Sequence, residues 1–383
     1  MKRLVFLSIV LLVGVFIFAG CGAPAPPPAP APAPAPPPAP APAPAPVSKP
    51  VPVPTPTPSP ATVIRLNFAE QDPLAGWGPV YCWQPLIKKM EEVAQNRIKI
   101  NYYPGQTLCK GIDAWKATKS GVADIAWCFH GYWAGMTPLA DVVSLPFLPF
   151  KSAEQASGIL WQLYEKYPSI KKSFAENHIQ LVWTSDPYFI ITTKKQVKTM
   201  EDLKGMKIRT VGGPPTDAVK ALGAVPMMIP MPDCYLALQK GVIDGMGAPW
   251  EAIEDNRLME AVQYYTYVPL FHTYFSIAWN WDRWNSLPPD IQKAIMDKCG
   301  GITGSKYAGY NMFDTAAKEG PELVKKQGYT MVENTPPPAE VQRWQDVAGK
   351  PLWEPWVKRM EAAGYPEARE ILNTVLDLIK TNP

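Results

Sequence analysis

Two hydrophobic periods alternate along the chain from residue 61 onward. Apolar residues at every second position in 63–69 and 97–103 predict strands, and apolar residues at helical spacing in 85–95 predict a helix between them. A strand, a helix and a strand of this length form a parallel pair, because parallel strands need a long crossover connection. This part of the chain is therefore expected to build an α/β layer.

The next elements occur twice. Residues 113–127 (DAWKATKSGVADIAW) predict a helix, a glycine turn and a strand, and residues 233–247 (DCYLALQKGVIDGMG) repeat that order, with Gly241 turning the chain into 242–244. In both copies an aspartate precedes the turn glycine by eight residues and another follows it by three. We therefore predict an α/β chain of two lobes, with two mixed sheets flanked by helices and a ligand cleft at the carboxyl ends of the strands.

The lobes are expected to interleave, because strand signals near Trp183 and near 272–281 mark two crossings. The predicted limits are residues 61–185 plus 273–300 for lobe one, and 186–272 plus 301–383 for lobe two. A long helix within 290–320 is expected to span both lobes, weakened by glycines at 300, 301 and 304, and the C-terminal helices 338–352 and 367–380 are expected to pack on lobe two.

The first twenty residues read as a secretory signal peptide. A positive start is followed by an apolar run at 4–18, which is shorter than the ~20 residues of a membrane-spanning helix. Small residues then lead into Cys21, as in a bacterial lipobox, so we expect residues 1–20 to be removed and Cys21 to carry lipid. The alternative is an uncleaved anchor helix, and both place the rest of the chain outside the cytoplasm.

Residues 21–60 are expected to be an extended tether. Residues 22–60 hold 20 of the chain's 46 prolines and have almost nothing to bury. Polyproline II rises about 3.1 Å per residue, so this segment could reach on the order of 120 Å. We interpret it as a passive spacer that holds the folded part away from a membrane.

Composition argues against several classes of function. The net charge of +3 gives no basic surface for nucleic acid. Five cysteines outside the lipobox, without CxxC spacing, imply no disulfide framework, and three unpaired histidines predict no metal site or cofactor. The motifs GxSxG, HExxH and GxxxxGK[ST] do not occur, so we predict no enzyme, with an extracytoplasmic hydrolase as the weaker alternative.

Several segments resemble a known family. They are 201–210 (EDLKGMKIRT), 221–224 (ALGA), 235–245 (YLALQKGVIDG) and 103–108 (YPGQTL), and the likeness covers 64–298. They are similar to the solute-binding subunit of tripartite ATP-independent periplasmic (TRAP) transporters, the DctP family. The resemblance implies a periplasmic-binding-protein-like fold of type II that closes on an organic acid and delivers it to a large and a small membrane subunit.

The resemblance also implies a location and leaves one alternative role. The protein is expected in the periplasm or on the outer face of the cytoplasmic membrane, held there by lipid on Cys21. A sensory or adhesive receptor lipoprotein of the same fold, not dedicated to transport, is the alternative that the sequence leaves open.

The resemblance assigns the carboxylate clamp of the family to Arg209, in the KIRT segment. A planar guanidinium donates two parallel hydrogen bonds to a carboxylate, which fixes its orientation. The family's Glu-Asn-Pro after the glycine turn is replaced here by a segment running from Met246 to Pro249, and a second family arginine is missing before Tyr188. One remaining charge favours a monocarboxylate with an apolar or aromatic body.

Aromatic residues at predicted strand ends support that preference, since stacking walls suit an aromatic or branched ligand. The alternative for each is ordinary core packing. The complete set of predicted ligand-binding residues is Arg209, Trp183, Tyr188, Trp127, Phe129, Met246, Ala248 and Trp250.

Overall fold

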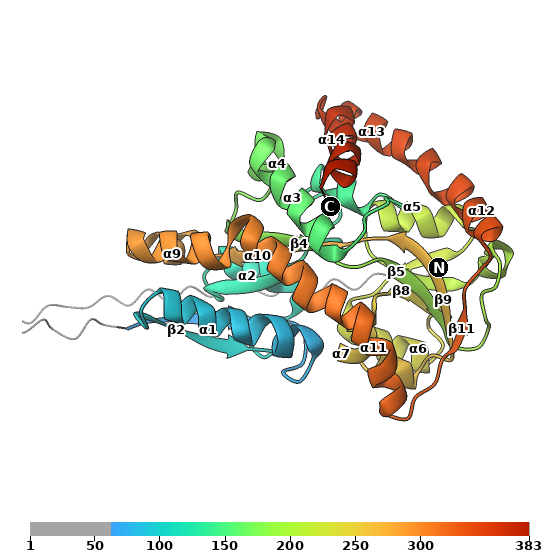
Figure 1. Cartoon of the computed structure of the whole chain (residues 1–383), viewed down its shortest axis with the longest axis horizontal. Coiled ribbons are helices and arrows are strands. Elements are labelled where there is room, and N and C mark those ends of the chain that lie inside the picture. The colour runs from blue at the N-terminus through green and yellow to red at the C-terminus, as the bar shows by residue number, and fades with distance from the viewer. Residues whose placement is uncertain (1–62, 383) are drawn as a thin grey trace, which may run out of the picture. The chain divides into compact units, whose positions relative to one another are not determined.

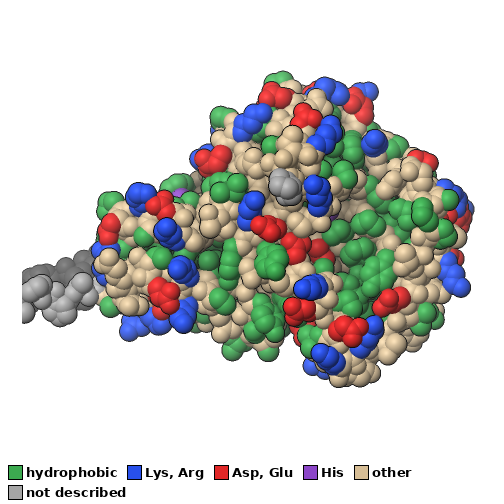
Figure 2. Space-filling view, viewed as in Figure 1, with side chains coloured by type: hydrophobic (Ala, Val, Ile, Leu, Met, Phe, Trp, Pro, Cys, Tyr) green, Lys and Arg blue, Asp and Glu red, His purple; other side chains and the backbone are tan. Residues whose placement is uncertain are grey.

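The computed structural model describes residues 63–382, which fold as two sheets with helices on their faces (Figure 1). The predicted signal peptide, the lipid-bearing Cys21 and the proline-rich tether lie outside the described residues. Within residues 63–382 no helix combines the length and the apolar character needed to cross a membrane. Charged side chains of both signs are spread over the face seen in Figure 2, without a large patch of one sign.

Lobe one is built on a mixed five-stranded sheet. Strand β1 runs parallel to β2 and β3, and β10 runs antiparallel to β3 and β4. In spatial order the strands are β2 (Ile98–Tyr103), β1 (Ile64–Ala69), β3 (Ile125–Phe129), β10 (Tyr274–Trp279) and β4 (His178–Thr184). Its helices are α1 (Gln84–Val93), α2 (Ala114–Lys119), α3 (Ala153–Lys166), α4 (Pro168–Ser173), α8 (Trp281–Asn285) and α9 (Pro289–Cys299).

Lobe two is built on a mixed six-stranded sheet. In spatial order its strands are β11 (Val332–Asn334), β9 (Tyr264–Phe271), β5 (Tyr188–Thr192), β8 (Gly245–Ala248), β6 (Lys207–Thr210) and β7 (Val225–Met228). Its helices are α5 (Pro214–Ala221), α6 (Met231–Gln239) and α7 (Trp250–Asp255). The prediction of two mixed sheets flanked by helices is confirmed. In the second copy of the repeat, β8 follows Asp244, as β3 follows Asp124 in the first.

Side-chain alternation gives each sheet two buried faces. In β3, Trp127 and Phe129 belong to the same core cluster as α1, whereas Ala126 and Cys128 face the opposite core with α3. In β8, Met246 and Ala248 both point into the core formed with α6 and α7. Successive side chains of a strand point to opposite faces, so strand register decides which residues reach the cleft.

The chain crosses between the lobes at residues 185–187 and 272–273, and the two crossings are hydrogen-bonded to each other. The Ser185 amide donates to the Thr273 carbonyl at 2.9 Å, and the Thr273 amide donates to the Ser185 hydroxyl at 2.9 Å. The two segments that connect the lobes therefore lie side by side and are held together by these hydrogen bonds.

The helical region after α9 spans both lobes, but it is not one helix from residue 290. Extended backbone at Gly300 separates α9 from α10 (Gly301–Ala308), which continues through a π-helical segment, η7 (Gly309–Asp314), into α11 (Thr315–Lys326). Helix α10 packs on α3 and β4 of lobe one, and α11 packs on α7 of lobe two (Figure 1).

The C-terminal helices divide between the lobes, which corrects one expectation. Helix α12 (Pro338–Ala348) packs on α5 of lobe two as expected, whereas α14 (Ala368–Thr381) packs on α3 of lobe one, joined by α13 (Trp353–Ala362). The assignment of 301–383 wholly to lobe two is therefore wrong for α10 and α14. Their apolar stripes were visible in the sequence, but a stripe does not identify the surface that covers it.

Candidate functional site

A small cavity lies between the two sheets and takes its walls from both lobes. Its volume is about 20 Å³, room for about one water molecule. A wider cleft of about 400 Å³ adjoins it and shares Gln71 and Asn256. The lining residues are Gln71, Asp72, Trp127, Phe129 and Phe275 from lobe one, and Tyr188, Met231, Glu251, Ala252 and Asn256 from lobe two.

Lobe one supplies an aromatic wall. Strands β3 and β10 pair with Phe129 opposite Phe275, and these two rings stack with centroids 4.8 Å apart. The ring of Trp127 lies 5.1 Å from that of Phe275 and 6.2 Å from that of Phe129. Trp183 is fully buried and stacks on Phe275 at 5.2 Å, so it supports the wall from behind and does not line the cavity.

Lobe two carries Arg209, from β6, which is buried and is not among the residues that line the cavity. Its side chain is fully buried, and its Nε donates to the Ile229 carbonyl at 2.9 Å. Both terminal nitrogens are buried without a hydrogen-bond partner among residues 63–382. Burial raises the pKa of the Tyr132 and Tyr188 phenols, and the nearby Arg209 charge opposes that rise in both. The guanidinium therefore acts on one tyrosine of each lobe.

Hydrogen bonds join the lobes across the cleft. Tyr132 of lobe one donates to the Gln71 side chain at 2.6 Å and accepts from the Met231 amide of lobe two at 3.0 Å. The Gly212 amide of lobe two donates to the Gly131 carbonyl of lobe one at 3.0 Å. The structure is thus a closed arrangement of the two lobes.

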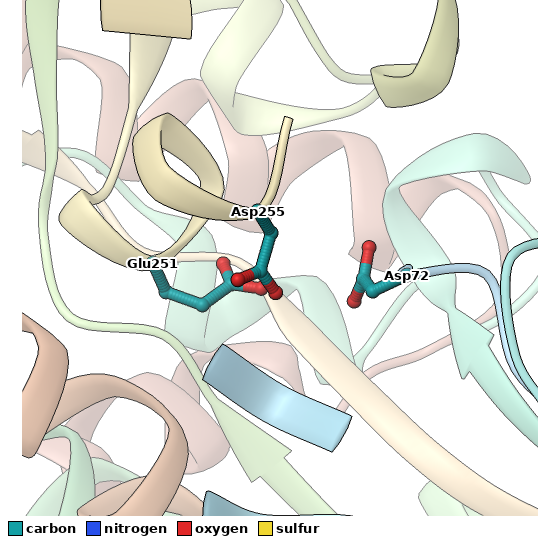
Figure 3. A group of neighbouring side chains, drawn as sticks. All are labelled: Asp72, Glu251 and Asp255. Carbon is teal, nitrogen blue, oxygen red and sulfur yellow. The ribbon is translucent and has the colours of Figure 1, made fainter. Parts of the chain in front are cut away.

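Three buried carboxylates lie close together, those of Asp72, Glu251 and Asp255 (Figure 3), and the first two line the cavity. Asp72 follows β1, and Glu251 and Asp255 lie one helical turn apart on α7, so both project from one face of that helix. Each offers an oxygen, and these oxygens lie within 4.8 Å of one another. Burial raises the pKa of all three carboxyls, that of Asp72 to about 6, and the neighbouring Asp255 charge raises that of Glu251 further.

Local backbone geometry orients Asp255. The amides of Trp77 and Gly78, at the start of the first helical segment of lobe one, point at its two carboxylate oxygens. A Cβ added at Gly76 would lie 2.8 Å from the same carboxylate, so a larger residue there would displace the Asp255 side chain. These residues could hold a cation, whereas the sequence predicted no metal.

The structure separates the predicted site residues into two groups. Trp127, Phe129 and Tyr188 line the cavity. Met246, Ala248 and Trp250 lie in the core of lobe two, where Trp250 stacks on Tyr265 at 4.7 Å, and none of the three lines the cavity. The reason is the direction of the side chains, since Met246 and Ala248 share the face of β8 that packs against α6 and α7.

Sequence reasoning missed Phe275 and the carboxylates. Asp72 follows a predicted strand at its carboxyl end, which was a usable signal. Glu251 and Asp255 carried a second signal, the spacing of four residues on one helix. Phe275 offered none, because only the antiparallel return of β10 beside β3 brings it to the wall.

Comparison with known proteins matches most of the chain. Residues 83–359 match the family model DctP, described as bacterial extracellular solute-binding protein, family 7. The uncharacterized protein YiiZ of Salmonella typhimurium is 29% identical over 209 residues, 54% of this chain and 62% of its own length. TsaT of Comamonas testosteroni, named an outer membrane transporter protein, is 25% identical over 237 residues, 60% of this chain and 68% of its own length.

Solved structures of similar fold cover more of both chains. A TRAP solute-binding protein from Rhodoferax ferrireducens, in complex with copurified benzoate, has a TM-score of 0.77 and 26% identity over 83% of this chain and 98% of its own. A marine metagenome TRAP solute-binding protein specific for aromatic acid ligands, in complex with 3-hydroxybenzoate, has a TM-score of 0.77, 28% identity and the same coverage.

Proposed function

Because the chain belongs to the DctP family of bacterial extracellular solute-binding proteins, we propose that it is the receptor of a TRAP transporter for a monocarboxylate with an aromatic body. The observation that carries this proposal is the buried Arg209, whose two terminal nitrogens have no partner among residues 63–382. A carboxylate would satisfy both with parallel charge-assisted hydrogen bonds. Burying an unpaired charge is costly, so the ligand and the guanidinium stabilise each other.

The walls of the cavity support an aromatic ligand body. Trp127, Phe129 and Phe275 line the cavity from lobe one, and Tyr188 lines it from lobe two. Offset stacking of rings contributes beyond the burial of area alone. The two similar structures above, at 26% and 28% identity, were solved with benzoate and 3-hydroxybenzoate.

Capture is proposed to proceed by closure of the lobes. The cavity holds about one water molecule, so an acid of the size of benzoate enters only when the lobes part. The ligand would bind the open form, and the lobes would then close on it as far as its volume allows, bringing Tyr132 and Gly212 back towards their partners in the opposite lobe. The closed form would be the one that the large and small membrane subunits recognise, and the role is binding without catalysis.

Anchoring is proposed to depend on Cys21, with residues 22–60 as the tether that places the receptor at the outer face of the cytoplasmic membrane. Metabolic labelling with a radioactive fatty acid tests this directly. Label should appear in the wild-type chain and be lost in Cys21→Ala, which should also be released from the membrane fraction. Label retained in that variant would contradict the proposal.

Isothermal titration of the purified protein with a panel of acids tests the ligand class. Benzoate, 3-hydroxybenzoate and mandelate should bind, while succinate and glucuronate should not. Truncating one partner of a buried charged pair costs on the order of 2–5 kcal/mol, so Arg209→Ala should weaken binding by roughly 30-fold or more. Arg369→Ala, which removes an exposed arginine of α14, is the matched control and should bind normally.

Arg209→Lys separates charge from geometry, because lysine keeps the charge but cannot form the bidentate pair. Its affinity should fall between those of the wild type and Arg209→Ala. Binding of dicarboxylates or sugar acids alone, or aromatic binding that survives Arg209→Ala, would overturn the proposed pocket.

A further inference from the structure

Three carboxylates that line the small cavity or the wider cleft, and a fourth next to Asp72, are buried without a basic partner among residues 63–382. Glu70, Asp72, Glu251 and Asp255 are each at most 5% exposed. None of the four forms an ion pair with a lysine, arginine or histidine of residues 63–382. Buried carboxylates of like charge repel one another strongly unless a cation or protons neutralise them.

The oxygen geometry suits one metal ion. Oxygens of Asp72, Glu251 and Asp255 lie within 4.8 Å of one another. Calcium binds oxygens at roughly 2.3–2.6 Å, so two ligands on opposite sides of the ion are at most about 5 Å apart. Figure 3 shows Asp72 facing the pair on α7 across a gap.

Buried oxygens without a hydrogen-bond partner are a second observation that favours a metal ion, separate from the distances between the carboxylates. Glu70 is 2% exposed and its Oε2 has no hydrogen-bond partner among residues 63–382, although its other oxygen accepts the amides of Gln71 and Asp72. Oδ2 of Asp72 is likewise buried without a partner in the described chain. The Glu70 carboxylate accepts the Asp72 amide at 3.0 Å, so a fourth buried acceptor lies next to Asp72.

We propose that Asp72, Glu251 and Asp255 bind a divalent cation that bridges the two lobes, with Glu70 beside them as a further oxygen donor. Calcium fits better than magnesium. Magnesium usually keeps several waters, whereas the adjoining cavity has room for about one, and calcium accepts irregular sets of carboxylates. Because Asp72 belongs to lobe one and the other two belong to α7 of lobe two, the ion favours the closed arrangement.

Calcium titration of the purified protein after treatment with chelator tests the site without any organic acid. The expected result is one bound ion per chain and a rise in melting temperature that chelator reverses. Asp72→Asn and Glu251→Gln should each weaken calcium binding at least tenfold. Asp113→Asn, which changes an exposed carboxylate of lobe one, is the matched control and should bind calcium like the wild type.

Terbium luminescence gives a second measurement that needs no variant to fold. Trp127 lines the same cavity as Asp72 and Glu251, so excitation of tryptophan should sensitise terbium bound there, and calcium should displace it. Magnesium should compete only at much higher concentration.

Three results would overturn the proposal. They are no stoichiometric calcium binding by the wild type, unchanged calcium affinity in both variants, and stabilisation by organic amines in place of calcium, which would assign the carboxylates to an ammonium group. The titrations of the Arg209 variants with organic acids test a different interaction, the one between Arg209 and the carboxylate of the ligand. Failure of the cation proposal can therefore be distinguished from failure of the proposed function.

Discussion

At the scale of the residue, burial changes the chemistry of the side chains at the crossing between the lobes. His272 is 3% exposed, and its Nδ1 lies 2.9 Å from the Ser185 carbonyl oxygen. Burial lowers the pKa of His272 to about 4, and the hydrogen bond to Ser185 opposes that change. The folded protein therefore keeps this imidazole neutral through the range in which an exposed histidine takes up a proton.

His272 should contribute to loss of stability in acid. Between about pH 6.5 and pH 4 the unfolded chain binds a proton at this residue and the folded chain does not, so the free energy of unfolding falls as the pH falls. The contribution of one such group is about 1.4 kcal/mol per pH unit. His272→Asn should make the slope shallower by about that amount, measured by urea denaturation between pH 6.5 and 4.5. An unchanged slope would show that His272 is not the titrating group.

At the scale of the element, α14 shows how an amphipathic helix stabilises a lobe without touching the ligand site. Its buried face carries Ile371, Leu372, Val375 and Ile379, which join the core that α3 forms on one face of the first sheet. No residue of α14 lines the cavity. The helix should therefore affect stability and leave affinity nearly unchanged.

Ile371→Ala should test that separation. Removing a fully buried isoleucine side chain costs about 2–5 kcal/mol, because it loses apolar burial and leaves a cavity. Chemical denaturation should detect the loss, while affinity for the organic acid stays within about twofold below the transition. Asn373→Ala, at an exposed position of the same helix, should leave both unchanged. A large loss of affinity in the Ile371 variant would contradict the independence of α14 from the site.

At the scale of the whole molecule, closure depends on a close approach of backbone between the lobes. The Gly212 amide donates to the Gly131 carbonyl at 3.0 Å. A Cβ added at Gly212 would lie 2.6 Å from the Ala134 Cβ, and its nearest neighbours all belong to lobe one. A side chain at this position therefore obstructs closure and leaves the packing inside each lobe intact.

Gly212→Ala should lower the affinity for the organic acid only by reducing the fraction of molecules that can close. Apparent affinity falls in proportion to the fraction of protein able to close, so a loss of about tenfold corresponds to about 1.4 kcal/mol of obstruction. Small-angle scattering with saturating ligand should show a more open molecule than the wild type. The double variant with Ala134→Gly should restore both properties, since it removes the obstructing methyl group. Failure of that rescue would show that Gly212 acts within its own lobe.

The sequence alone determined the repeated order of helix, turn and strand, the two mixed sheets and the family. These depend on local periodicity and on contiguous motifs such as the segment around Arg209. It also placed Phe129 and Tyr188 at the ends of strands, and Trp127 in the same strand as Phe129.

Only the tertiary structure decided the rest. The register of β8 turned Met246 and Ala248 into the core, and packing partners sent α14 to lobe one. Asp72 meets Glu251 and Asp255 only when the lobes close, and Phe275 reaches the wall only through the antiparallel return of β10. Contacts between segments distant along the chain depend on how whole elements pack, and neither periodicity nor a short motif encodes that geometry.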